Sequence, residues 1–156
     1  MKKILLVAIV VFSILTVTNA GNTGESYVDR YKRFAIELMT KSGIPASITL
    51  AIALVESGGG TSRICKKLNN HFGVRGRNSG IIRSTYKEYE SVEAAYLDFI
   101  RMISVKKFYN KLKDSKDVSK WIAALSKSGY SEVPAVWSKK IFSTISQYNL
   151  TVYDKE

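Results

Sequence analysis

The sequence predicts an α+β domain that is mostly helical and carries one small, short β-hairpin lobe. Two observations predict it. Apolar residues recur at helical spacing in several separate segments, and one glycine-punctuated stretch, residues 72–89, loses that spacing. The chain has 156 residues, of which 46% are hydrophobic and 24% charged, as in globular proteins. A chain of this length normally forms one domain and folds without disulfides or metals.

The first twenty residues have the layout of a secretory signal peptide. Lys2 and Lys3 precede an uncharged apolar run, residues 4–17, and Ala20 ends a small-x-small exit. The other interpretation is a membrane anchor, but the run is shorter than the ~20 residues that a spanning helix needs. We therefore expect cleavage after Ala20, export to the periplasm, the cell envelope or the medium, and no stable membrane insertion. The mature domain is expected to cover residues 21–156.

The first half of that domain is predicted to contain three helices. The apolar residues between Tyr27 and Lys41 lie on one helical face. Residues 46–55 are apolar almost all round, which is typical of a helix in the middle of a domain. Thr61 or Ser62 is expected to cap a third, short and basic helix.

The second half is predicted to contain the hairpin and three more helices. Asn78-Ser79-Gly80 has turn chemistry within the hairpin, and β-branched and aromatic residues follow it. Ser91 and Asp117 are expected to cap two amphipathic helices, and Pro134 to open the last one. Phe99 and Trp121 face inward in this pattern, so we expect them in the core rather than as sugar-binding platforms.

Composition excludes several classes of function. Cys65 and His71 are the single cysteine and histidine, so an internal disulfide and a zinc site built from several Cys and His ligands are excluded. We expect no metal and no cofactor, because the glycine-rich phosphate-binding patterns are also absent. A Cys65–His71 nucleophile and base remains an alternative, but no protease signature surrounds it.

The net charge of +11 falls to +9 when the two lysines of the signal peptide are removed. The remaining Lys and Arg are spread along the chain and form no recognised nucleic-acid-binding motif, so no nucleic-acid partner is expected. A basic surface instead suits an anionic polymer of the cell envelope.

Glu56 calls for a chemical explanation. It follows the apolar helix 46–55, where burial disfavours its charged form and the negative end of the helix dipole repels it. Both effects raise its pKa, as general acid catalysis on a glycosidic oxygen requires. The three glycines after Ser57 are expected to leave room for a polymeric substrate. The alternative is that Glu56 marks a solvent-exposed helix end that Gly58 caps.

Four ordered segments between Tyr27 and Asp154 give the chain a family resemblance. They are GIPASITLAIALVESGGGTS (43–62), NNHFGVRG (69–76), YKEYESVEAAYLDF (86–99) and SGYSEVPAVWSKKI (128–141). They resemble the endo-β-N-acetylglucosaminidases of glycoside hydrolase family 73, which are bacterial autolysins and flagellar peptidoglycan hydrolases. The resemblance implies a lysozyme-like fold. It also implies cleavage of the β-1,4 bond between N-acetylglucosamine and N-acetylmuramic acid in peptidoglycan glycan strands.

The resemblance also implies roles for individual residues. It places the catalytic acid on Glu56, in the A-x-x-E-S-G context, and a substrate-groove aromatic on Tyr130. Trp137 takes the place of a second aromatic by a looser match. Asn70 and Phe72 are further candidates for substrate binding, although an asparagine here also suits the hydrogen bonding of a loop.

The predicted hairpin lacks the second carboxylate that many members of the family place there. Residues 74–85 contain no Asp or Glu, and the nearest acids, Glu88 and Glu90, are better explained as solvated strand charges than as the second carboxylate. An inverting enzyme needs a base ~6.5–9.5 Å from the acid, and a retaining one a nucleophile at ~5–5.5 Å. Without either, the substrate's own 2-acetamido group attacks the anomeric carbon. We expect this substrate-assisted route, with Glu56 protonating the leaving oxygen and Tyr130 orienting the acetamido group.

Two other functions fit the same residues. A muramidase or lytic transglycosylase of the lysozyme superfamily also uses a single acidic Glu, although no G-L-M-Q-like block follows Glu56-Ser57 here. A degenerate hydrolase that only binds peptidoglycan would have lost the hairpin acid, but retention of Glu56 argues against it.

Overall fold

A computed structural model describes residues 23–155. The predicted signal peptide therefore lies outside the described residues, and the domain boundary at residue 21 stays a prediction. In chain order the elements are α1 (Thr23–Ser42), α2 (Ala46–Ser57), α3 (Arg63–Leu68), α4 (Val92–Ser104), α5 (Tyr109–Leu112), α6 (Val118–Lys127), α7 (Pro134–Gln147) and the 3₁₀ helix η1 (Leu150–Lys155). None of these helices is long and apolar enough to cross a membrane.

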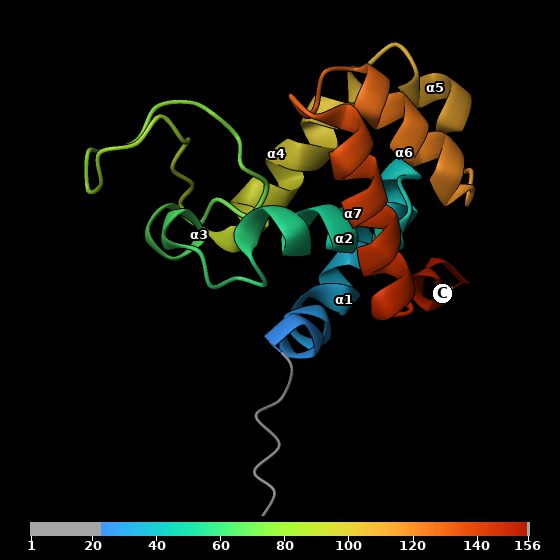
Figure 1. Ribbon diagram of the computed structural model, residues 1–156, viewed down its shortest axis with the longest axis horizontal. Coiled ribbons are helices and arrows are strands. Elements are labelled where there is room, and N and C mark those ends of the chain that lie inside the picture. Colours follow the sequence, from blue (N-terminus) through green and yellow to red (C-terminus); the bar gives the residue numbers. More distant parts are fainter. Residues whose placement is uncertain (1–22, 156) are drawn as a thin grey trace, which may run out of the picture.

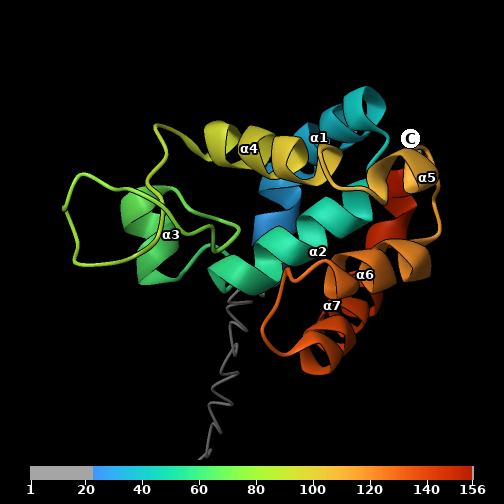
Figure 2. The ribbon, with the colours of Figure 1, turned by 90° about the horizontal axis from the view of Figure 1, so that it is seen from above.

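Helix α2 occupies the centre of the domain. In Figure 2 it runs between α1 and α4 on one side and α6 and α7 on the other. Every residue from Ala46 to Leu54 is buried, as the all-round apolar pattern predicts. The helix ends where Gly58 adopts the left-handed conformation at φ 60°, which a residue without a Cβ reaches at little cost. The last turn of α2 therefore carries Glu56 from the core to the surface.

The N-terminus of α2 is held by the C-terminal segment. Pro45 precedes the helix and makes no side-chain cap. The buried carboxylate of Asp154, in η1, instead accepts hydrogen bonds from the Ser47 backbone N–H at 2.9 Å and from the Ser47 hydroxyl at 2.6 Å. An anion here satisfies an otherwise unpaired N–H and complements the positive end of the helix dipole. The 3₁₀ helix η1, which the spacing of apolar residues did not predict, thus caps the central helix α2.

The other helix starts follow local sequence. Ser62, Ser91 and Asp117 accept backbone N–H bonds as N-caps of α3, α4 and α6, each at 3.1 Å, and Pro134 opens α7. These predicted starts are confirmed. The four-residue helix α5 is too short to show a period and was not predicted. The core positions expected for Phe99 and Trp121 are confirmed, since both side chains are fully buried.

Residues 69–91 form a hairpin-shaped loop, the hairpin lobe, at one side of the helical body (Figure 1). Its arms meet in a single antiparallel bridge between Arg75 and Tyr86, and Lys87 donates its backbone N–H to the Val74 carbonyl at 2.8 Å. No regular strand occurs among the described residues. The hairpin therefore lies where it was predicted, with its strands shortened to one bridge, and the mostly helical fold is confirmed.

Candidate active site

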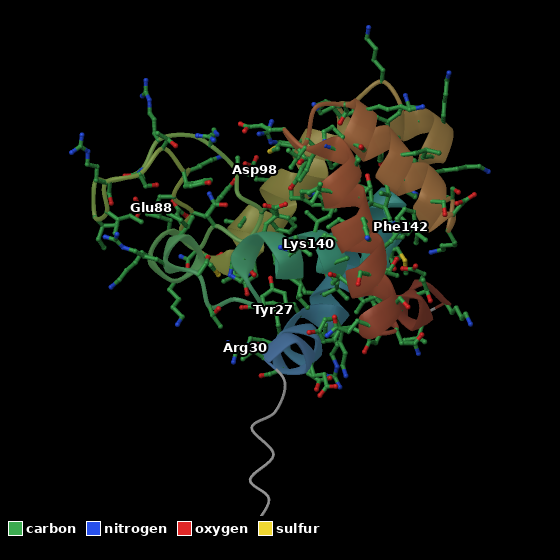
Figure 3. The ribbon with its side chains drawn as sticks, viewed as in Figure 1. Tyr27, Arg30, Glu88, Asp98, Lys140 and Phe142 are labelled. Atoms are coloured by element: carbon green, nitrogen blue, oxygen red, sulfur yellow. The ribbon has the colours of Figure 1, made fainter. Side chains whose placement is uncertain are left out.

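Glu56 lies half-buried at the C-terminal end of α2, where α7 crosses it. Trp137 of α7 donates its indole N–H to Glu56 Oε1 at 3.0 Å. Lys140 lies one turn further along α7, and Figure 3 shows it where α7 passes over α2. Burial raises the pKa of Glu56, while the Trp137 hydrogen bond and the positive charge of Lys140 lower it. Burial prevails, so the net direction is upward.

The two oxygens of Glu56 have different surroundings. An indole N–H is only a donor, so Oε1 acts as an acceptor and Oε2 is the oxygen that can carry the proton. Gly73, at φ 66°, lies beside Oε2: a Cβ on this residue would stand 3.2 Å from that oxygen. Gly73 therefore keeps the approach to the proton-bearing oxygen clear of side chains.

The glycines that follow α2 do not clear space beside Glu56, contrary to the sequence-based expectation. A Cβ on Gly59 would approach Thr23, and one on Gly60 would stand 3.0 Å from the ring of Tyr27. Gly60 thus lets the turn after α2 pack closely on α1, whereas a Cβ on Gly59 would make only ordinary van der Waals contact. Gly73, which follows Phe72 far along the chain, has the role that was expected of them.

Tyr130 and Trp137 form an aromatic wall next to Glu56. Their ring centroids are 5.3 Å apart, and the Tyr130 hydroxyl donates to the Phe72 carbonyl at 3.2 Å. Burial and then the negative charge of Glu56 raise the pKa of Tyr130 well above its usual value, so the phenol stays neutral. The structure thus brings the predicted Glu56, Tyr130 and Trp137 together. It also gives Trp137 a role as hydrogen-bond donor that its helical spacing did not reveal.

Asn70 and Phe72 lie behind this wall rather than on it. Asn70 is 1% exposed, and its amide bonds to the Val74 backbone and to the Lys87 carbonyl, which joins the two arms of the hairpin lobe. Phe72 is 3% exposed and stacks on Phe99 at 4.3 Å between centroids. Their burial argues against direct substrate contact and favours a supporting role for both residues. The loop-holding role foreseen for Asn70 is confirmed.

Asp98, which sequence reasoning missed, ties the hairpin lobe to α4. Its carboxylate accepts hydrogen bonds from Lys87 and Tyr89 of the lobe, each at 2.8 Å, and from Arg101 of its own helix at 2.6 Å. Burial opposes ionisation, but the hydrogen bonds from these three groups lower the pKa of Asp98 to about 2. Figure 3 shows Asp98 on α4, between the lobe and the helical body. In the sequence it is one polar residue on an amphipathic helix, and nothing in that pattern indicates its role in holding the lobe.

The two candidate second acids belong to the hairpin lobe. Glu88 accepts the backbone N–H of Ser79 at 2.6 Å, and hydrogen bonding to Ser79 lowers its pKa. Figure 3 shows Glu88 in the lobe, apart from Lys140 on α7. Glu90 is exposed. The hydrogen bonding of Glu88 is thus that of a turn-stabilising carboxylate.

Cys65 and His71 do not form a nucleophile and base. His71 Nδ1 is paired with the Tyr27 hydroxyl at 2.5 Å, and that hydroxyl also bonds Tyr96 at 2.9 Å. Burial lowers the pKa of His71 to about 4 and raises that of Cys65 to about 11. A thiolate–imidazolium pair needs the opposite shifts. Within residues 23–155, no three His, Cys, Asp or Glu side chains are placed to hold a metal ion.

Comparison with known proteins assigns the family. The family model described as mannosyl-glycoprotein endo-beta-N-acetylglucosaminidase, the glucosaminidase family, matches residues 32–150, well over half of the chain. The chain belongs to this family. The resemblance to family 73 glycoside hydrolases is thereby confirmed, and Glu56, Tyr130 and Trp137 all lie within the matched part of this glucosaminidase domain.

Individual relatives agree with this assignment. The exo-glucosaminidase LytG of Bacillus subtilis (strain 168) is 29% identical over 150 residues, which cover 83% of this chain and 53% of that protein. The chain therefore spans about half the length of this relative.

Solved structures show the same fold. The catalytic domain of the autolysin Auto from Listeria monocytogenes has a TM-score of 0.71 at 21% identity, covering 89% of this chain and 92% of that one. A truncated glycoside hydrolase domain of FlgJ from Salmonella typhimurium has a TM-score of 0.67 at 22% identity, covering 81% and 97%. At these identities the likeness concerns the fold, and the predicted lysozyme-like fold is confirmed.

Proposed function

We propose that this glucosaminidase domain hydrolyses peptidoglycan at the β-1,4 bond between N-acetylglucosamine and N-acetylmuramic acid, with Glu56 as the general acid. One observation carries the proposal: a half-buried carboxyl of raised pKa at the end of the central helix, with one oxygen held by Trp137 and the other open toward Gly73. Peptidoglycan as substrate is supported by relatives such as the peptidoglycan hydrolase of Sphingomonas sp. A1. Export to the cell envelope, also proposed, follows from that substrate.

The reaction begins with proton transfer. The Glu56 carboxyl gives its proton to the glycosidic oxygen while the bond from that oxygen to the anomeric carbon breaks. The carbonyl oxygen of the substrate's 2-acetamido group forms a new bond to the same carbon from the face opposite the leaving group, which gives a cyclic oxazolinium intermediate. Water then attacks this carbon, the acetamido oxygen leaves, and the water's proton returns to the Glu56 carboxylate. The neutral phenol of Tyr130 orients the acetamido group.

The substrate-assisted route is favoured by the hairpin lobe. Residues 74–85 contain no carboxylate, and Glu88 is engaged with the Ser79 backbone. Retention of configuration at the anomeric carbon is the expected outcome. Inversion, or an inactive but folded Glu88→Gln or Glu90→Gln variant, would contradict this route and assign the second role to a lobe carboxylate.

The decisive experiment is Glu56→Gln in a zymogram on purified peptidoglycan. The amide keeps an acceptor for the Trp137 indole but has no proton to give, so we expect activity to fall by roughly 10²–10⁴-fold. Glu37→Gln, an exposed substitution on α1, is the matched control and should clear like the wild type. An active Glu56→Gln enzyme refutes the assignment, and a folded wild type that binds without clearing indicates a peptidoglycan-binding protein.

Product analysis distinguishes this reaction from those of lytic transglycosylases and muramidases. A new reducing end on N-acetylglucosamine is expected, whereas a 1,6-anhydro-muramoyl end would indicate a lytic transglycosylase and a reducing muramic acid end a muramidase. The size of the fragments distinguishes cleavage within the strand, which we expect, from cleavage at its end, as the name of the Bacillus subtilis relative describes.

A further inference from the structure

A groove of about 590 Å³ runs along α6, opposite the segment 106–112. Its floor is apolar: Phe108 and Leu112 line it and pack against the core, and Ala123 and Ala124 form the side contributed by α6. The volume is within the range of about 300–1,000 Å³ that is usual for ligand sites.

All the charged residues that line this groove are basic. Five lysines line it and no acidic residue does, so we call it the lysine groove. Within the described residues, an ion pair joins one of the five, Lys120, to Asp117 at 3.2 Å. The side chains of Lys106, Lys107 and Lys111 are exposed and project from one short segment. Such an arrangement of cations around an apolar floor attracts a ligand that is both anionic and partly apolar.

One end of the lysine groove lies close in the chain to a residue of the candidate active site. Ser128 lines the groove, and Tyr130, two residues later, belongs to the aromatic wall. The Tyr130 ring lies 5.3 Å from that of Trp137, whose indole bonds Glu56. A short run of chain therefore connects the groove to the proposed catalytic carboxyl.

We propose that the lysine groove binds the peptide stems of peptidoglycan; this inference rests on the proposed function. A stem is a short peptide attached to the lactyl group of N-acetylmuramic acid, and it carries alanine methyl groups and free carboxylates. The apolar floor accepts the methyl groups and the lysine rim accepts the carboxylates. A polymer of phosphates alone would use the rim and leave the floor without a partner.

The dimensions also agree. From Lys120 to Ser128, α6 rises about 12 Å at 1.5 Å per residue. An extended stem of four residues spans roughly 13–14 Å at ~3.3–3.6 Å per residue. One stem therefore matches the length of the groove wall, and its attachment point at the sugar faces the Ser128 end.

The test measures binding without requiring hydrolysis. Proteins carrying Glu56→Gln are pelleted with stem-bearing peptidoglycan and with glycan strands from which the stems were removed by an amidase. We expect about tenfold tighter binding to the stem-bearing polymer, the magnitude usual for a few rim charges. Adding Lys106→Gln, Lys107→Gln and Lys111→Gln should abolish this difference and leave binding to the stripped strands unchanged.

The matched control changes the same number of charges elsewhere. Lys66→Gln, Lys67→Gln and Lys139→Gln, all exposed and outside the lysine groove, should keep the tenfold difference. If the groove variant keeps it too, the proposal is overturned. It is also overturned if the loss appears only on walls that still bear phosphate polymers, since the ligand is then the polyphosphate.

Clearing assays test the proposed hydrolase activity independently of the binding measurement. If the protein with Glu56 intact clears neither substrate, the hydrolase proposal fails, while stem-dependent binding that the groove variant loses would still support the lysine groove. Clearing of the wall together with stem-independent binding would instead support the hydrolase and overturn the proposal for the lysine groove.

Discussion

The helical body and the hairpin lobe are held together by different forces. In the body, α2 is buried from Ala46 to Leu54 among other helices, so apolar packing fixes its position. The hairpin lobe packs Phe72 and Tyr89 against the core, but its two arms share one bridge and are joined by polar side chains, above all Asn70 within the lobe and Asp98 at its base. Glu56 stands where the two regions meet. The proposed acid is thus set on a rigid support, opposite a hairpin lobe whose arms are joined by a few hydrogen bonds.

Removing the cap of α2 should destabilise the helical body more than any change in the hairpin lobe destabilises the protein. Asp154→Ala leaves the Ser47 N–H and hydroxyl without their buried carboxylate partner, so we expect the free energy of unfolding to fall by about 2–3 kcal/mol. Chemical denaturation measures this loss, while activity per folded molecule should stay near normal.

Two variants control for that experiment. Asp154→Asn keeps an acceptor and should lose about half as much stability. Asp29→Ala breaks an exposed pair with Lys32 and should cost less than about 1 kcal/mol. A loss in Asp154→Ala no larger than that of Asp29→Ala would show that packing alone holds the first turn of α2.

A smaller effect, confined to the lobe, is expected from Asp98→Asn. The amide keeps the shape but loses the charge that holds Lys87 and Arg101, so unfolding should become easier by only about 1 kcal/mol. Amide exchange at Gly76 and Lys87, both in cross-arm backbone bonds, should accelerate roughly tenfold. The KM for polymeric substrate should rise as the hairpin lobe loosens. Equal acceleration in α2 would mean that body and lobe unfold together.

The same Asp98 pair has a defined pH dependence. Because the pKa of Asp98 is lowered to about 2 in the folded protein, its contribution is fully present above about pH 4 and is lost as the pH falls through about 2.

The smallest effect is expected from Trp137, through which helix α7 of the body influences the pKa of Glu56. Trp137→Phe removes a hydrogen bond that lowers the pKa of Glu56, so this pKa should rise further. A general acid works while protonated, hence activity declines as the pH rises through its pKa. The alkaline limb of the pH–activity profile should therefore move to higher pH. A limb that stays in place would show that the indole only packs.

Local sequence predicted much of the body and less of the site. Caps such as Ser62, Ser91 and Asp117 are predictable because their bonds reach only three residues along the chain. The Trp137–Glu56 bond spans 81 residues, and the sequence indicated Trp137 only as a loose match to a second aromatic of the family. Gly73 beside Glu56 is equally a product of tertiary structure. Asn70 was expected to bind substrate because its motif resembled the family's, yet its burial shows that the same residue supports the loop.

The pairing of Ser47 with Asp154 also sets an order of events during synthesis. The two residues are 107 positions apart, so the ribosome completes the sequence of α2 long before Asp154 exists. Until then the first turn of the central helix has no carboxylate partner, and closing so long a loop is slow compared with forming a local cap. A chain interrupted anywhere before η1 lacks the carboxylate that caps the helix carrying Glu56. The proposed acid is made in the first half of the chain, but its support is completed only at the end.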